Sequence, residues 1–247
     1  MKIVFLGTNG WYSTEQGNTI CTFISTEEFD IILDAGDGLY KIDKYVKGDK
    51  PIVLLLSHIH LDHVIGLHIL NKFRFQSKIN IYGLNGIKKA LISLLNHPYT
   101  APLSEVPLNI SINELNEGTV KTPFNLKCNL LEHSDPCLGF RIEIEGKVIT
   151  YCTDTGLCGN LYKLSDQADV LITECSYKSG QEKWGWPHLK PEEAAEVALK
   201  SNVKKLILTH FDASIYLNSE NRKEAEMKAR EIFPNTICAN DELSVDL

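Results

Sequence analysis

Short apolar runs separated by polar turns recur along the first half of the chain, and their length predicts strands. The run Ile52-Val53-Leu54-Leu55-Leu56 has no polar position, which is typical of a strand buried on both faces. An amphipathic stretch near 38–46 and a helical pattern from Ile87 to Leu95 interrupt these runs. The strands predicted in this half cover residues 2–6, 19–25, 29–33, 52–56 and 79–82.

The second half alternates strands with helices. A helix is expected to begin at Pro191, because a proline followed by Glu192 and Glu193 suits a first helical turn. A charged helix is expected over 219–232, and the region 97–123, rich in Pro, Asn, Ser and Glu, is predicted to be the least regular part. The strands predicted here cover 124–131, 138–145, 147–152, 169–173 and 204–208.

Together these elements predict an α/β fold. Mostly antiparallel strands in the first half, and helices between strands in the second, indicate two sheets packed together with helices outside. Neither a linker nor an internal repeat is visible, and a length of 247 residues fits one large domain. We therefore expect a single domain over residues 1–247.

Composition narrows the setting and the partners. No apolar stretch approaches the roughly 20 residues that span a bilayer, and the first residues lack a signal-peptide pattern, so no membrane partner is expected. The seven cysteines form no C-x-x-C pair, which indicates free thiols in a cytoplasmic protein. A net charge of −7 argues against an extended nucleic-acid track but not against a small phosphate substrate held by metals.

The segment Ser57-His58-Ile59-His60-Leu61-Asp62-His63 follows the buried strand at 52–56. Side chains alternate along extended backbone, so His58 and His60 point the same way and can bind one ion. Where the backbone turns past the strand end, Asp62 and His63 can face a second ion. This spacing predicts a paired-metal site.

Three further candidate ligands stand at or just after the ends of hydrophobic strands. They are His133, Asp154 and His210, which follow the strands predicted at 124–131, 147–152 and 204–208. A lone histidine in such a place is more often structural. Four strand ends that all carry such side chains favour a metal site.

On these residues the chain resembles the metallo-β-lactamase fold hydrolases, and within them the ribonuclease Z-like phosphodiesterases. The resemblance also covers Leu6-Gly7-Thr8-Asn9-Gly10, Gly17-Asn18-Thr19 and Leu33-Asp34-Ala35-Gly36-Asp37-Gly38. It implies a four-layer αββα sandwich of two mixed sheets with outer helices. It also implies one ion held by His58, His60 and His133, a second held by Asp62, His63 and His210, and Asp154 bridging both.

The donor types agree with this implied assignment. Imidazole and carboxylate ligands suit two divalent ions, zinc first, with manganese or iron as alternatives. Two such ions can share a water, lower its pKa and clamp both oxygens of an in-line displacement. Asp34 and Asp37 are candidates for orienting ligand imidazoles, and forming the turn before the next helix is an equal alternative.

His188 lies outside the ligand set, immediately before the helix that begins at Pro191. The resemblance implies that it donates a proton to the leaving oxygen, and that Glu174 orients it. An imidazole suits this task because its ordinary pKa, about 6.5, lies near the working pH. The alternative is a solvent-exposed histidine at a helix start. The predicted catalytic residues are His188, Asp62 and Glu174.

The substrate is expected to be small. Transfer-RNA-maturing members of the resembled group carry an arm between the positions that match His133 and Asp154, and here only twenty residues separate these positions. A cyclic nucleotide, a cyclic phosphate or an RNA 3′ end is therefore preferred, with a homodimer as the expected assembly. The alternatives are a lactonase or thioesterase that uses the same site, and a noncatalytic metal-binding assembly subunit.

All three tryptophans, Trp11, Trp184 and Trp186, lie in segments predicted to be loops around the metals. At least one is expected to stack against a nucleobase, since such stacking tolerates any base. The alternative is that they cap the core at the bases of the loops.

Overall fold

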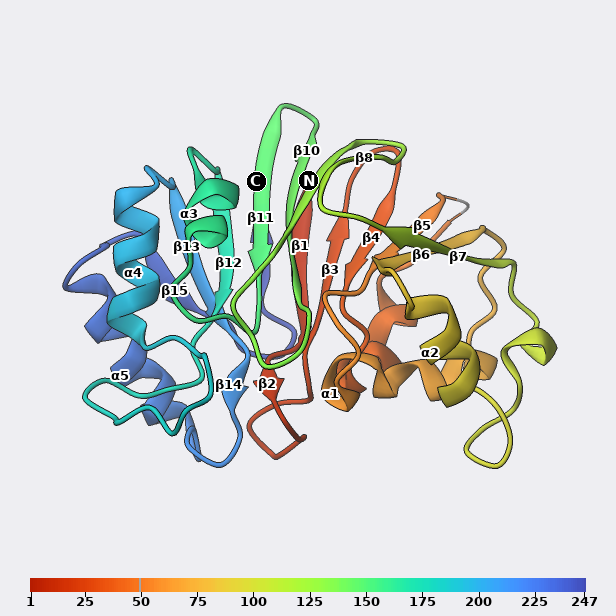
Figure 1. The fold of residues 1–247 in the computed structure, drawn as a ribbon, viewed down its shortest axis with the longest axis horizontal. Helices are drawn as coiled ribbons and strands as arrows, with labels where there is room; N and C mark the ends of the chain where they lie inside the picture. Colours follow the sequence, from red (N-terminus) through yellow and green to blue (C-terminus); the bar gives the residue numbers. More distant parts are fainter. Residues whose placement is uncertain (49) are drawn as a thin grey trace.

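Two seven-stranded sheets lie at the centre of the computed structural model, which describes residues 1–48 and 50–247 (Figure 1). The first sheet has the order β16 (Ser244–Asp246), β1 (Lys2–Gly7), β3 (Cys21–Ser25), β4 (Asp30–Leu33), β5 (Ile52–Leu55), β6 (Ile79–Leu84) and β7 (Ile110–Leu115). The second has the order β15 (Thr236–Cys238), β13 (Lys205–Thr209), β12 (Val170–Glu174), β11 (Lys147–Cys152), β10 (Leu138–Ile144), β9 (Asn125–Leu130) and β8 (Gly118–Lys121). Two very short strands, β2 (Asn9–Gly10) and β14 (Phe211–Asp212), pair at the lower edge of the view.

Helices cover the outer face of each sheet. The first sheet is covered by the 3₁₀ helices η1 (Asp37–Lys44) and η2 (Ile65–Lys72) and by α2 (Ile87–Leu94). The second is covered by α3 (Gly159–Ser165), α4 (Pro191–Lys200) and α5 (Ser219–Arg230). Two short helices, α1 (Leu61–Val64) and η3 (Leu103–Glu105), complete the set in the described part of the chain.

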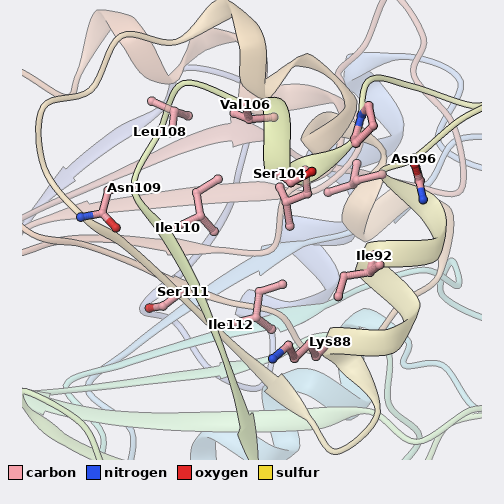
Figure 2. A pocket seen from close by; sticks show the side chains of 13 residues that line it. Lys88, Ile92, Asn96, Ser104, Val106, Leu108, Asn109, Ile110, Ser111 and Ile112 are labelled. Atoms are coloured by element: carbon pink, nitrogen blue, oxygen red, sulfur yellow. The ribbon is translucent and has the colours of Figure 1, made fainter.

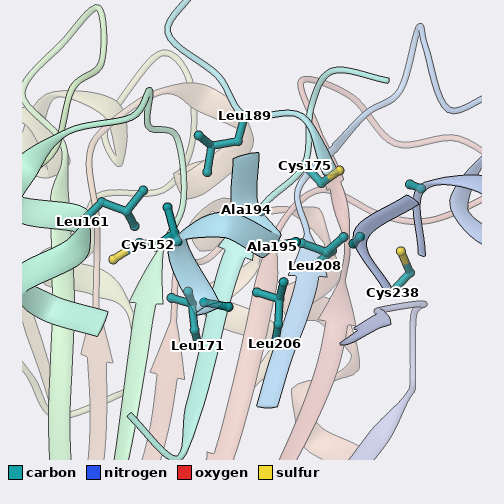
Figure 3. Packing of buried hydrophobic residues seen from close by; sticks show 14 of the residues in the cluster. Cys152, Leu161, Leu171, Cys175, Leu189, Ala194, Ala195, Leu206, Leu208 and Cys238 are labelled. Carbon is teal, nitrogen blue, oxygen red and sulfur yellow. The ribbon is translucent and has the colours of Figure 1, made fainter. Parts of the chain in front are cut away.

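The core explains why strands such as β5 have no polar residue. Val53 and Leu55 pack between the two sheets, whereas Ile52 and Leu54 pack under the outer helices of the first sheet. Because alternate side chains of a strand point to opposite faces, a strand in an inner layer must be apolar on both. Figure 3 shows the corresponding contact of the second sheet, where Leu171 and Leu206 face the alanines of α4. The predicted αββα sandwich of two mixed sheets is confirmed.

Two expectations about the strands are wrong. Strands β4 to β7 run parallel to one another, so the first half is antiparallel only at β1, β3 and β4. The region 97–123, expected to be irregular, supplies β7 and β8. Both lie at the ends of their sheets, where a strand with one open edge tolerates the polar residues that hid it in the sequence. Within residues 1–48 and 50–247, no helix has the length and apolarity needed to cross a membrane.

Candidate metal centre

The seven predicted ligands converge at one edge of the sandwich. They form two groups, and within each group the possible ligand atoms all lie within 4.8 Å of one another. The first group is His58, His60, His133 and Asp154, and the second is Asp62, His63 and His210. The short helix α1 carries Asp62 and His63, so the backbone turns after the strand as expected, but into a helix. That the seven residues bind metal ions stays a prediction.

Asp154, counted above with the first group, also faces the second. Its Oδ1 is 3.2 Å from Nε2 of His63 and 3.1 Å from Nε2 of His210. Its Oδ2 is 3.9 Å from Nε2 of His58 and 3.8 Å from Nε2 of His133. One carboxylate oxygen therefore faces each group, which is the arrangement that a bridging ligand needs.

The backbone turns sharply at three of the site's residues. Asp34, Asp154 and His210 have φ angles of 55°, 48° and 51°, in the left-handed region. Non-glycine residues seldom adopt this region, although Asp and His do so more readily than most. Each stands at the end of a buried strand, and such conformations cluster at functional sites because the surrounding structure holds them in place. The turns aim these polar side chains at the edge where the groups meet.

The pairing of β2 with β14 places the loop after Gly10 against the second group. A Cβ atom on Gly10 would lie 2.5 Å from Cε1 of His210, so only glycine lets the two segments approach this closely. The backbone N–H of Trp11 donates to Oδ2 of Asp62 over 2.8 Å. This main-chain contact was not foreseen, because it depends on the pairing of two segments 200 residues apart.

Carboxylates orient two of the imidazoles. Oδ2 of the fully buried Asp34 lies 2.9 Å from Nδ1 of His63, and Asp34 also accepts the hydroxyl hydrogen of Tyr151 over 2.7 Å. Oδ2 of Asp135 lies 2.9 Å from Nε2 of His60. Asp135 was missed in the sequence, although its place two residues after His133 was a usable signal.

The expectation that Asp37 orients a ligand imidazole is wrong. Its Oδ2 accepts from Oγ of Ser13 over 2.7 Å and from Nδ2 of Asn18 over 3.0 Å, not from an imidazole. Asp37 therefore holds the loop that carries Trp11 in place. It is linked to the second group only indirectly, through the contact of that loop with Asp62.

The cluster fits a pair of cations. Nε2 of His58 is buried and has no hydrogen-bond partner among the residues described, and it faces Asp154. Burial, with the charge of His63, lowers the pKa of His58, and burial lowers the pKa of His133, so both stay in the neutral form that binds metal. Burial also opposes a charge on His63, yet the carboxylates of Asp154, Asp62 and Asp34 raise its pKa well above the ordinary value. A cluster of imidazoles and carboxylates, most of them buried, suits a divalent metal ion.

His188 and Glu174 lie beside the two groups. Nδ1 of His188 is 2.7 Å from Oε1 of Glu174, and the His188 ring centroid is 5.5 Å from that of His133 and 6.2 Å from that of His210. Glu174 is fully buried, and its carboxylate also accepts the backbone N–H groups of Thr155, Ser176 and Leu189. Burial opposes the charged imidazole, but the Glu174 carboxylate outweighs it and raises the pKa of His188 to about 9.

The three tryptophans are exposed rather than packed into the core. Trp11, Trp184 and Trp186 expose 68%, 66% and 53% of their surface, which rules out the alternative that they merely cap the core. A separate groove of about 650 Å³ between α2 and β7 is lined by side chains such as Ile92 and Ile112 and by none of the candidate ligands (Figure 2). The site is therefore the exposed edge around the two groups, not that groove.

Comparison with known proteins agrees with this fold. The family model described as the beta-lactamase superfamily domain matches residues 31–211, well over half of the chain. The chain therefore belongs to the beta-lactamase superfamily. Within it, the chain is similar to Ribonuclease Z of Bacillus licheniformis, with 26% identity over 304 aligned positions that cover 98% of this chain and 97% of the relative.

Solved structures give the same picture of the fold. The metallo-beta-lactamase fold protein YhfI from Bacillus subtilis superposes with a TM-score of 0.80 at 19% identity and 99% coverage of both chains. The short form of human tRNase Z gives a TM-score of 0.79 at 23% identity, over 100% of this chain and 99% of that one. The predicted resemblance to ribonuclease Z-like proteins is confirmed.

Proposed function

We propose that the chain is a metal-dependent phosphodiesterase that acts on a small phosphodiester, such as a cyclic nucleotide, a cyclic phosphate or an RNA 3′ end. The observation that carries this proposal is the His188–Glu174 pair beside two groups of metal-competent side chains. Phosphodiester hydrolysis needs a proton donor, because an alkoxide is a poor leaving group. The similarity to Ribonuclease Z supports the same bond class.

Two divalent ions, zinc by preference, would supply Lewis acidity and a water of lowered pKa when bound to these ligands. The chain's own residues do the rest. With Nδ1 of His188 engaged by Glu174, Nε2 is the nitrogen left to deliver a proton. Against the effect of burial, the Glu174 carboxylate raises the pKa of His188, which favours the protonated imidazole as the donor. As the bond from phosphorus to the leaving oxygen breaks, that oxygen takes the proton, and His188 is left neutral.

The segment between His133 and Asp154 supports the proposal of a small substrate. Strands β10 and β11 pair from Phe140–Tyr151 to Ile144–Lys147, so the segment is a hairpin rather than an arm. The alignment with the Bacillus licheniformis relative spans 304 positions, whereas this chain has 247 residues, so that relative holds stretches that this chain lacks. A chain without an arm and with a net charge of −7 has few means of holding a large RNA.

Side-by-side assays on metal-loaded protein test the proposal. We expect hydrolysis of bis-p-nitrophenyl phosphate and of 2′,3′-cyclic nucleotides, abolished by His63→Ala. Turnover of lactones or thioesters without phosphodiester turnover would overturn it in favour of a carboxyl-ester hydrolase, and two bound ions with no turnover of either class would favour an assembly subunit. The homodimer, the cytoplasmic location and the single domain over 1–247 stay predictions.

A further inference from the structure

We propose that Trp184 and Trp186 form a stacking subsite for a nucleobase next to the proton donor, so that the substrate is a nucleoside phosphodiester. This inference rests on the proposed function and names the substrate class of that site. Both tryptophans lie on the segment between β12 and α4, which also carries His188.

The structure holds this segment in place while it leaves the indoles open. The backbone N–H of Trp184 donates to the hydroxyl of Tyr177 over 3.1 Å, and that hydroxyl donates to the backbone oxygen of Trp186 over 3.3 Å. The backbone N–H of His188 donates to the same oxygen of Trp186 over 3.0 Å. Tyr177 is itself buried. One buried phenol therefore ties both tryptophans to the proton donor, and their side chains stay more than half exposed.

Leaving two indoles exposed has a cost, because each large aromatic side chain forgoes the burial that stabilises most such residues. Exposed apolar surface that is gathered beside a polar site marks a place where a ligand binds. Other exposed apolar side chains stand close in sequence to candidate ligands: Leu157, three residues after Asp154, and Ile59, between His58 and His60. Exposed apolar residues thus flank both the candidate ligands and the proton donor in the sequence.

Two lysines of this segment are engaged elsewhere. Nζ of Lys183 lies 2.9 Å from a carboxylate oxygen of Glu193, and Nζ of Lys178 lies over the ring of Tyr216 at 5.9 Å. The segment therefore offers flat aromatic faces rather than a row of free charges for further phosphates. A ligand with one phosphodiester and one planar ring system, which is a nucleoside phosphodiester, matches exposed aromatic side chains beside a candidate metal site.

The test compares two substrates that differ only in the base: adenosine 2′,3′-cyclic phosphate, and the 2′,3′-cyclic phosphate of 1-O-methylribose. We expect kcat/KM to be about 5- to 150-fold higher for the nucleotide, the range that corresponds to about 1–3 kcal/mol for one stacked base. In Trp184→Ala/Trp186→Ala this ratio should fall toward one while activity on the abasic compound remains. Tyr99→Ala, which removes another exposed aromatic far along the chain, should leave the ratio unchanged.

A binding measurement gives an independent result. Trp11 is the third tryptophan of the chain, so in Trp11→Phe the tryptophan fluorescence comes from Trp184 and Trp186 alone. We expect adenosine 3′-phosphate to quench it and ribose 5-phosphate to leave it unchanged. Equal kcat/KM for the two substrates in the unaltered protein, or equal loss on both in the double variant, overturns the subsite and leaves the proposed function standing. Hydrolysis of neither substrate by protein that hydrolyses lactones overturns the proposed function itself.

Discussion

Nδ1 of His188 lies 2.7 Å from Oε1 of Glu174, and the exposed fraction of the two side chains is 16% and 0%. The buried carboxylate is held by three backbone N–H groups, so it cannot swing away from the imidazole. In the proposed mechanism Glu174 therefore acts through His188, as a positioning residue that orients the imidazole and favours its charged form.

Glu174→Gln tests this relationship through pH dependence. Burial opposes the charged imidazole of His188 and the Glu174 carboxylate raises its pKa to about 9, so loss of that charge lowers the pKa. Since the protonated form is the donor, activity should fall as the pH rises through the pKa, and this alkaline limb should move to lower pH in the variant. The measurement is kcat against pH for an alkyl phosphodiester. The matched control is Glu182→Gln, at an exposed glutamate of the same segment, and an unmoved limb in Glu174→Gln would argue against a protonated His188.

Asp34→Asn should weaken metal binding at the second group. Asp34 keeps His63 oriented through a 2.9 Å contact, and asparagine can adopt the same left-handed backbone. Loss of a carboxylate that orients a ligand imidazole typically costs about 10- to 100-fold in metal affinity. Competition with a chelator measures the affinity of each ion. Asp43→Asn, at an exposed carboxylate paired with Lys72, should bind both ions normally, and an equal loss there would remove the special role of Asp34.

Gly10→Ala should disturb the second group from the opposite side. The added Cβ would meet the ring of His210 at 2.5 Å, so the imidazole must move. A misplaced ligand should lower kcat/KM on the order of 10- to 100-fold, with loss of one bound ion. Metal content and activity are measured on the same sample. Gly159→Ala, where an added Cβ meets nothing within 4 Å, is the control. Normal activity in Gly10→Ala would contradict this prediction and show that the loop after Gly10 can move away from His210.

Much of the site could be predicted from residue type and order. The ligand candidates follow strands, and a strand's end marks where its polar side chains gather, so His58, His133, Asp154 and His210 were found without a structure. The alternation of strands and helices also predicted the layers correctly, because buried strands such as β5 leave an unmistakable apolar run.

What was missed depends on contacts between distant segments. The contact of the Trp11 backbone with Asp62 requires the pairing of β2 with β14. Local sequence patterns do not predict a pairing between segments so far apart in the chain. The parallel run of β4 to β7 was missed although the amphipathic stretch near 38–46 and the helical pattern from Ile87 to Leu95 form two of its crossovers, η1 and α2. A helical connection is what parallel strands need, so these helices were a usable signal. Asp37 was misplaced because a carboxylate that holds a loop and one that holds an imidazole look alike in sequence.

The central claim is that His188 protonates a phosphodiester leaving group, and the dependence of rate on that leaving group tests it most directly. We compare kcat/KM for uridine 3′-phosphodiesters with methanol or p-nitrophenol as the leaving group, in the unaltered protein and in His188→Ala, with the exposed His97→Ala as control. The account predicts that His188→Ala loses about 100-fold or more with methanol, which needs the proton, and far less with p-nitrophenol, which does not. Equal losses with both leaving groups would contradict it.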